Sequence, residues 1–285
     1  MARVRPPYWG GMSSPPPLHF PDVMTQTFRL CFSNVRALFD LALIPTIISV
    51  ALMLGLRLVS DGPASPRLLG LVKLLDLIPT AMFAVGWYRW LLLGPPQASV
   101  VAGLGWSSRE TGFLREFLVI FGVPIVIMGI FLLQLPDDRM VLTPNDVRGL
   151  PPEVRALGIL VPFAFVGALV GMRLSFGLAA PAVDETWRAS MAWRYSKGNA
   201  MVAMGTVFVV SVIGMIGELI LAGLAMAIVR TLLGPGAGLG AALILGLILA
   251  TISYVKLGLV AATQAVIFRH LTGWRPGEAL RPPPA

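Results

Sequence analysis

Charged side chains are scarce in this sequence of 285 residues: Asp, Glu, Lys and Arg make up 13% of it, about half the share typical of a soluble domain. Hydrophobic residues make up 56%, and the mean hydropathy is +0.80. So few polar side chains cannot cover a water-facing surface, which excludes an ordinary soluble protein. The same composition excludes a disordered or collagen-like chain, despite 24 prolines and 30 glycines. We therefore expect a polytopic membrane protein.

Side chains that perform catalysis or bind metals are also rare. Cys31 is the only cysteine, which excludes an intrachain disulfide and a cysteine-based metal site. The two histidines, His19 and His270, lack the spacing to a carboxylate that a zinc site requires. The sequence also lacks a phosphate-binding loop, a nucleophile elbow and a dinucleotide-binding motif. We expect no catalytic residue, no metal and no cofactor, and so a protein that is not an enzyme.

Basic residues outnumber acidic ones by 22 to 14, which gives a formal net charge of +8. In a soluble chain this excess would suggest nucleic acid, but no basic run with interleaved aromatic residues occurs. Basic loops that orient transmembrane helices and contact anionic headgroups explain the excess better. The predicted partners are therefore a bilayer with anionic headgroups and a membrane protein, but not a nucleic acid.

The pattern along the chain predicts three parts. Residues 1–23 form a Pro-rich arm without the apolar region of a signal peptide, which we expect to be disordered. Residues 24–273 form a transmembrane domain, and residues 274–285 form a loose tail. Because about 20 apolar residues cross a bilayer as a helix, six spans are predicted, at residues 38–56, 71–93, 117–135, 157–178, 201–228 and 239–268. The loops on the side of both termini carry about twice as many Lys and Arg residues as the other loops, which predicts cytoplasmic termini in a bacterial inner membrane.

A short basic segment precedes the first, third and fifth spans. Arg29, Arg109 and Arg194 lie in these segments, 80 and 85 residues apart, which indicates an internal repeat. Apolar residues accompany them at helical spacing: Phe28, Phe32, Val35 and Phe39; Trp106, Phe113 and Phe117; and Trp187, Met191 and Tyr195. Such helices lie in the headgroup plane, so the three arginines are candidate lipid contacts. The predicted fold class is all-α and integral to the membrane, with six helices as three hairpins, each preceded by a cytoplasmic amphipathic helix.

Five strings in these segments also support a family resemblance. They are TFRLCFSNVRALFDLALIP, WYRWLLLGPP, RLSFGLAAPAV, AWRYSKGN and IFRHLTG. Together they resemble the YciC-like bacterial inner-membrane proteins and the similar membrane domains fused to some glycerophosphodiester phosphodiesterases. The resemblance covers about residues 24–273. It implies a six-helix integral membrane protein, and it carries over no catalytic residue.

Ionisable residues inside the spans are the sharper functional candidates, because a charge in hydrocarbon faces protein or water. Glu218 in the fifth span and Lys256 in the sixth lie at similar depth, so a hairpin would let them pair, with Tyr254 or Gln264 nearby. This pair is either part of a proton or substrate path or a structural ion pair, and the sequence leaves both open. A second pair, between Asp76 and its i−3 neighbour Lys73, is expected near the outer interface.

Two functions follow from these observations. The first is a protein without catalytic activity that serves envelope organisation or membrane homeostasis by binding lipid or partner proteins. It depends on the missing catalytic groups, the basic interfacial segments and the family resemblance. The alternative is a small transporter or channel with a polar path near Glu218 and Lys256. A hydrated cavity at these residues would favour transport, whereas a direct contact in a dry core would favour the first function.

Overall fold

A computed structural model describes residues 17–59, 66–95, 106–133, 160–234, 238–280 and 283. Within these ranges the chain is helical, with no strand. Five segments are long and apolar enough to cross a membrane, as the composition predicts: Val35–Leu56, Gly70–Leu93, Pro162–Val183, Ala200–Leu233 and Gly238–Thr272. Several apolar helices of this kind are what a membrane protein requires, because only a helix satisfies its own backbone groups in lipid.

The expected third span falls on helix α5 (Ser108–Leu133), which has Pro124 in its interior. Residues 134–135 of that span and residues 157–159 of the next lie outside the described part of the chain. The predicted count of six spans therefore remains a prediction.

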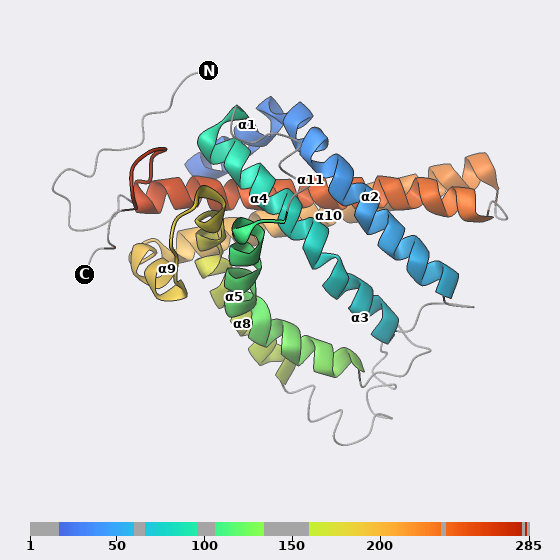
Figure 1. Ribbon diagram of the computed structural model, residues 1–285, viewed down its shortest axis with the longest axis horizontal. Helices are drawn as coiled ribbons and strands as arrows, with labels where there is room; N and C mark the ends of the chain where they lie inside the picture. The colour runs from blue at the N-terminus through green and yellow to red at the C-terminus, as the bar shows by residue number, and fades with distance from the viewer. Residues whose placement is uncertain are drawn as a thin grey trace.

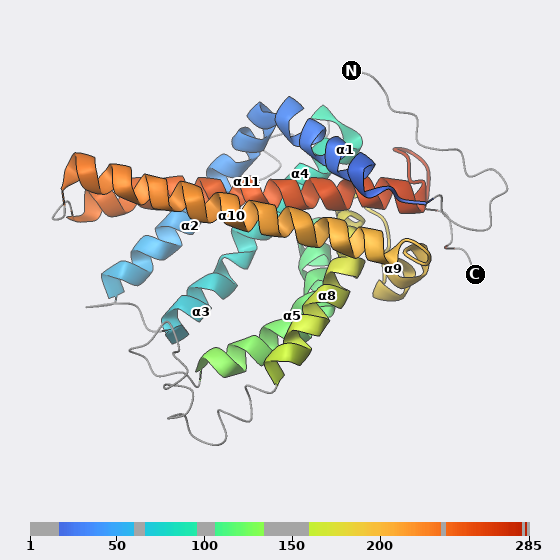
Figure 2. The ribbon, with the colours of Figure 1, turned by 180° about the vertical axis from the view of Figure 1, so that it is seen from behind.

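The two longest described helices, α10 (Ala200–Leu233) and α11 (Gly238–Thr272), pack along each other. Helix α2 (Val35–Val59) packs against α11 and against α4 (Leu77–Leu93), and α5 packs against α8 (Leu160–Leu174). From the region where these helices meet, they run outward in different directions (Figures 1 and 2). Helix α11 is the centre of the fold, because it contacts α10, α2, α4, the first helix (Phe20–Ser33) and the segment that follows α8.

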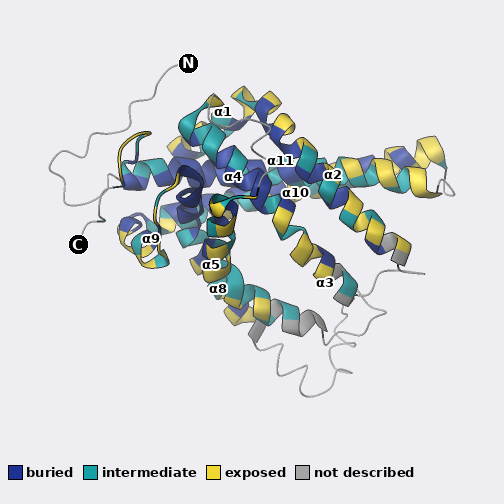
Figure 3. Cartoon of the chain, in the orientation of Figure 1, coloured by how far each residue is buried: buried dark blue, intermediate teal, exposed yellow. Residues whose placement is uncertain are grey.

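Buried residues gather where α4, the second half of α11 and the segment after α8 meet (Figure 3). Large aromatic side chains fill this core, among them Trp87, Tyr88, Phe176 and Phe268. By contrast, large apolar side chains on the outer parts of α10 are exposed, such as Leu219, Ile220 and Leu232. This pattern suits helices whose outer faces contact lipid and whose inner ends pack as in a globular protein.

Two expected spans are not continuous α-helices. A break at Asp76 separates α3 (Pro66–Leu75) from α4, and Pro79 explains it, since its missing N–H leaves the carbonyl four residues earlier without a helical partner. After α8, the chain continues as two short 3₁₀ helices, η3 (Ser175–Ala179) and η4 (Pro181–Val183). These breaks change the direction of the chain close to the aromatic core.

Helix α1 (Phe20–Ser33) corrects one expectation. It begins at Phe20, so the arm expected to extend to residue 23 ends earlier. Its buried face consists of Val23, Thr27 and Cys31, whereas Phe32 on the expected apolar face is 70% exposed. The reason is close packing on α11: small side chains let Thr27 Oγ1 approach Thr263 Oγ1 to 3.4 Å and let Cys31 Sγ approach the Gly258 carbonyl to 3.6 Å.

The expected loose tail also begins later than residue 274. Trp274 is buried, its ring centroid lies 6.1 Å from that of Phe268, and its Nε1 donates a hydrogen bond to Glu185 at 3.0 Å. An apolar side chain with a satisfied N–H gains more from docking on the core than from exposure to water. The transmembrane domain therefore includes at least Trp274.

Candidate functional site

An ion pair joins α10 to α11 at the positions that the sequence singled out. Lys256 Nζ donates to one carboxylate oxygen of Glu218, and the Ser253 hydroxyl donates to the other. The stem of Lys256 packs on Gly214, where an added Cβ would lie 2.6 Å from Lys256 Cγ. Gly214 is thus the residue that lets Lys256 reach Glu218 across the helix contact. The direct contact is an observation, and the role of the pair in function remains a prediction.

The neighbours expected for this pair were wrong. Tyr254 bonds instead to Ser49 on α2, with 2.9 Å between the two hydroxyl oxygens. Gln264 accepts a hydrogen bond from the Tyr88 hydroxyl on α4. Tyr254 lies on the opposite side of α11 from Lys256, and Gln264 lies about two turns further along the helix. Ser253, which the sequence did not single out, is the third member of the cluster.

A second polar cluster lies between α2, α11 and the break at Asp76. The Ser49 hydroxyl donates to Asp76 Oδ1, and Lys73 Nζ lies 4.0 Å from Asp76 Oδ2. The Lys73–Asp76 contact occurs as its spacing predicts, but the buried Ser49 joins it to Tyr254 as well. A lone serine in an apolar span gives no sequence signal of this kind, since Ser usually bonds within its own helix.

Of the three arginines predicted to contact lipid, two are exposed and one is held inside a polar cluster. Arg29 on α1 and Arg194 on α9 (Ala189–Tyr195) are exposed. Arg109, in the first turn of α5, instead forms two hydrogen bonds with Asp184, from Nε at 2.7 Å and from Nη2 at 2.9 Å. Arg109 thus has a carboxylate partner within the protein, and its contact with lipid remains a prediction, as it does for Arg29 and Arg194.

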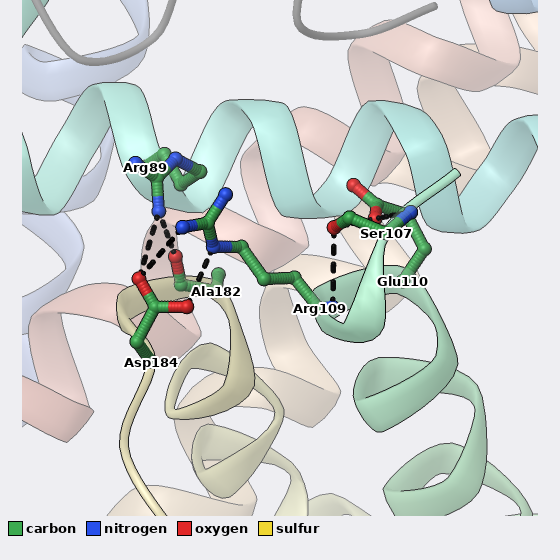
Figure 4. Close-up of polar contacts among 6 residues, drawn as sticks. All are labelled: Arg89, Ser107, Arg109, Glu110, Ala182 and Asp184. Carbon is green, nitrogen blue, oxygen red and sulfur yellow. Dashed lines mark hydrogen bonds and ion pairs between the residues drawn. The ribbon is translucent and has the colours of Figure 1, made fainter. Parts of the chain in front are cut away.

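Arg89 on α4 points to the same carboxylate (Figure 4). Its Nη1 donates to the Ala182 carbonyl at 2.8 Å and lies 3.6 Å from Asp184 Oδ2. Asp184 stands just after η4 with a φ of 63°, a left-handed conformation that Asp tolerates better than most residues. The turn thereby directs one carboxylate between two guanidiniums that come from different parts of the chain. This arginine junction (Arg89, Arg109 and Asp184) carries a net positive charge.

The start of α5 fixes the position of Arg109. The Ser107 backbone N–H donates to Glu110 Oε2 at 2.8 Å, and the Arg109 N–H donates to Ser107 Oγ at 3.2 Å. This reciprocal pattern is a capping box, which the Ser-x-x-Glu spacing in the sequence could have predicted. The hydrogen bonds to Asp184 raise the pKa of the Arg109 guanidinium above its already high ordinary value. Arg109 is therefore a permanent cation.

In the basic segment before α10, the apolar face that was expected to meet lipid is buried instead. Trp187 and Tyr195 are buried and stack on each other, with ring centroids 5.6 Å apart. Trp187 also meets Phe176 and Phe268 edge-on. Burial raises the pKa of the Tyr195 phenol to about 12. These aromatic residues fill the core because they lie where three segments meet, which helical spacing alone does not reveal.

In comparisons with family models, with curated proteins and with solved structures, the chain matched none. The resemblance to the YciC-like proteins therefore remains a prediction. Among the residues that the structure describes, no three His, Cys, Asp or Glu side chains group closely enough to hold a metal ion.

Proposed function

We propose that this chain is a six-span protein of the bacterial inner membrane, built of three hairpins with both termini in the cytoplasm, and related to the YciC-like proteins. It has no catalytic activity in this proposal. It serves envelope organisation or membrane homeostasis by binding anionic lipid headgroups and a partner protein at its basic end. The proposal extends the all-helical, apolar architecture described above.

The observation that supports it is a set of exposed cations on the same segments as exposed aromatic side chains. The cations are Arg29, Arg36, Arg188, Arg194 and Lys197, and the aromatic side chains are Phe32, Phe39 and Trp193. Cations attract anionic headgroups, and aromatic rings favour the border between headgroup and hydrocarbon.

The segments that carry the two parts of this set meet at one point in the fold. The backbone N–H of Leu18 donates to Asn199 Oδ1 at 2.7 Å, so the start of α1 meets the start of α10. Helix α9, which carries Trp193 and Arg194, ends only a few residues before that point. The cations of α1 and α9 can therefore contact the same region of a membrane surface.

The test measures the binding of phosphatidylglycerol and phosphatidylcholine to the purified chain by native mass spectrometry. Arg194→Gln should weaken phosphatidylglycerol binding about fivefold, since a basic residue near an anionic surface contributes roughly 1 kcal/mol. Arg230→Gln is the matched control, because Arg230 is an exposed arginine in the last turn of α10, at the opposite end of that helix. Equal effects of the two substitutions, or none, would contradict the proposal.

The alternative function is transport along a polar path at Glu218 and Lys256. Glu218 and Lys256 contact each other directly, and the Ser253 hydroxyl donates to the other carboxylate oxygen of Glu218. This arrangement supports a structural role instead. A flux assay on proteoliposomes with Glu218→Gln and Lys256→Met distinguishes the two. Variants that keep the fold but abolish a flux of the wild-type chain would favour transport and contradict the first function.

A further inference from the structure

Three membrane-crossing segments end around one cavity. The candidate spans end at Leu93, Val183 and Thr272, and the cavity, of about 350 Å³ and open to the surface, is lined by Leu93, Val183 and Trp274 among others. The end of an apolar span marks the border of the hydrocarbon. The cavity therefore lies at the depth of the lipid headgroups, and a volume of this size suits a small ligand.

The cavity carries charges of both signs. Its polar lining consists of Arg89, Asp184, Glu185 and Glu278. Asp184 is neutralised by the arginine junction, where the guanidiniums of Arg89 and Arg109 share its carboxylate (Figure 4). The lining thus has a basic pole at Arg89 and an acidic pole at Glu185 and Glu278.

The fold holds the side chains of Arg89 and Glu185. Arg89 is held by the Ala182 carbonyl at 2.8 Å, and its side chain is mostly buried. The carboxylate of Glu185 accepts a hydrogen bond from Trp274 Nε1, and the Glu185 backbone N–H donates to the Ala180 carbonyl at 3.1 Å. Glu278 follows Gly277, which has a φ of 84° in a turn, and both residues line the cavity. The Arg89 and Glu185 side chains are thus held in place by the fold, whereas Glu278 lies at the surface of the cavity.

A cavity with both poles at headgroup depth fits a ligand that carries a phosphate and an amine. A guanidinium is the side chain best suited to phosphate oxygens. Carboxylates suit a primary ammonium, because its three N–H groups donate hydrogen bonds to them. A quaternary ammonium prefers the open faces of several aromatic rings, whereas Trp274 is buried and packs against Phe268.

We propose that this cavity binds the headgroup of a zwitterionic phospholipid with a primary ammonium group. Arg89 contacts the phosphate, and Glu185 and Glu278 contact the ammonium. This site is separate from the exposed cations proposed above to bind anionic lipid, and it selects lipids by a different chemistry.

The experiment compares phosphatidylethanolamine with phosphatidylcholine of the same acyl chains, bound to the purified full chain and measured by native mass spectrometry. The wild-type chain should bind phosphatidylethanolamine at least tenfold more tightly. Glu278→Gln should reduce this binding roughly fivefold, the effect of one exposed ion pair worth about 1 kcal/mol, with phosphatidylcholine binding unchanged. Glu278 is exposed, so this substitution spares the core. Glu185→Gln gives a second variant, in which the amide oxygen still accepts from Trp274.

Asp22→Asn is the control, because Asp22 is an exposed carboxylate in the first turn of α1. It should leave both affinities unchanged. Equal affinity of the wild-type chain for the two lipids, or a preference that persists in both Gln variants, would overturn the proposal. Soluble phosphoethanolamine should compete only at concentrations at least a hundredfold higher than the lipid, and equal potency would overturn a lipid as the ligand. The proposed binding of anionic lipid at the exposed cations is tested separately, by phosphatidylglycerol binding to Arg194→Gln. Either proposal can therefore fail while the other holds.

Discussion

The indole of Trp187 lies directly on Gly177: a Cβ built on this glycine would be 2.0 Å from Trp187 Nε1 and 2.5 Å from Cε2. Gly177 belongs to η3, and Trp187 lies just before α9. The contact therefore joins two parts of the segment that connects α8 to α10. Trp187 also stacks on Tyr195 and meets Phe268 of α11. One missing side chain therefore allows the aromatic core to form.

Gly177→Ala should destabilise the protein by about 1–3 kcal/mol, because the added methyl group forces the indole out of its place. Thermal unfolding of the detergent-solubilised chain, followed by tryptophan fluorescence, measures this loss. Gly205→Ala is the control, since a Cβ there has no heavy atom within 4 Å and Ala favours a helix. An equal midpoint for Gly177→Ala and wild type would show that the core adapts at no cost.

The contact between Arg109 and Asp184 should contribute a coupling free energy of about 0.5–1 kcal/mol. It is a two-point contact between partly exposed groups, for which this range is typical. The double-mutant cycle uses Arg109→Gln and Asp184→Asn, because Asn tolerates the left-handed backbone at that position. The coupling should decrease at high salt, since exposed charges are screened. Strict additivity at low salt would contradict a direct interaction.

Glu218→Gln and Lys256→Met should each destabilise the helix pair by about 2–3 kcal/mol, because the remaining charge is left in an apolar environment. The double variant should lose less than the sum of the two. Unfolding in graded mixtures of detergent and dodecyl sulfate measures the three values. If the loss of unfolding free energy in the double variant equalled the sum of the two single losses, the two side chains would not stabilise each other.

The thiol of Cys31 should react slowly with maleimide while the protein is folded. Burial raises its pKa to about 12, so only about one thiol in ten thousand is ionised at pH 8. The double variant Cys31→Ser with Ser33→Cys is the control, since Ser33 is exposed on the same helix and its thiol should react fast. Rapid labelling of native Cys31 would show that α1 detaches from α11.

The same thiol gives a pH dependence of known sign. The folded pKa lies above the reference value of 9.0, so the unfolded chain releases the proton first as pH rises. The contribution of Cys31 to stability is complete below pH 9 and decreases toward pH 12. The unfolding midpoint should therefore fall more steeply with pH between 9 and 11 in the wild-type chain than in Cys31→Ser.

The sequence by itself determined the helical, membrane-like class of this protein. Long apolar runs predict helices because hydrocarbon offers the backbone no other partner. It also determined the pairing of Glu218 with Lys256, because two charges at equal depth on adjacent helices have few alternatives. The Ser-x-x-Glu spacing at Ser107 also indicates where α5 begins, since a capping box is a local interaction.

Only the tertiary structure decided which aromatic residues are buried and which carboxylates meet the arginines. Trp187 and Phe32 stand in similar basic segments, yet one is buried in the core and the other is 70% exposed. Asp184 is separated from Arg109 by 75 positions, and Ser49 from Tyr254 by 205. Such contacts depend on how helices cross and where 3₁₀ turns redirect the chain, and neither is encoded in the periodicity of a single segment.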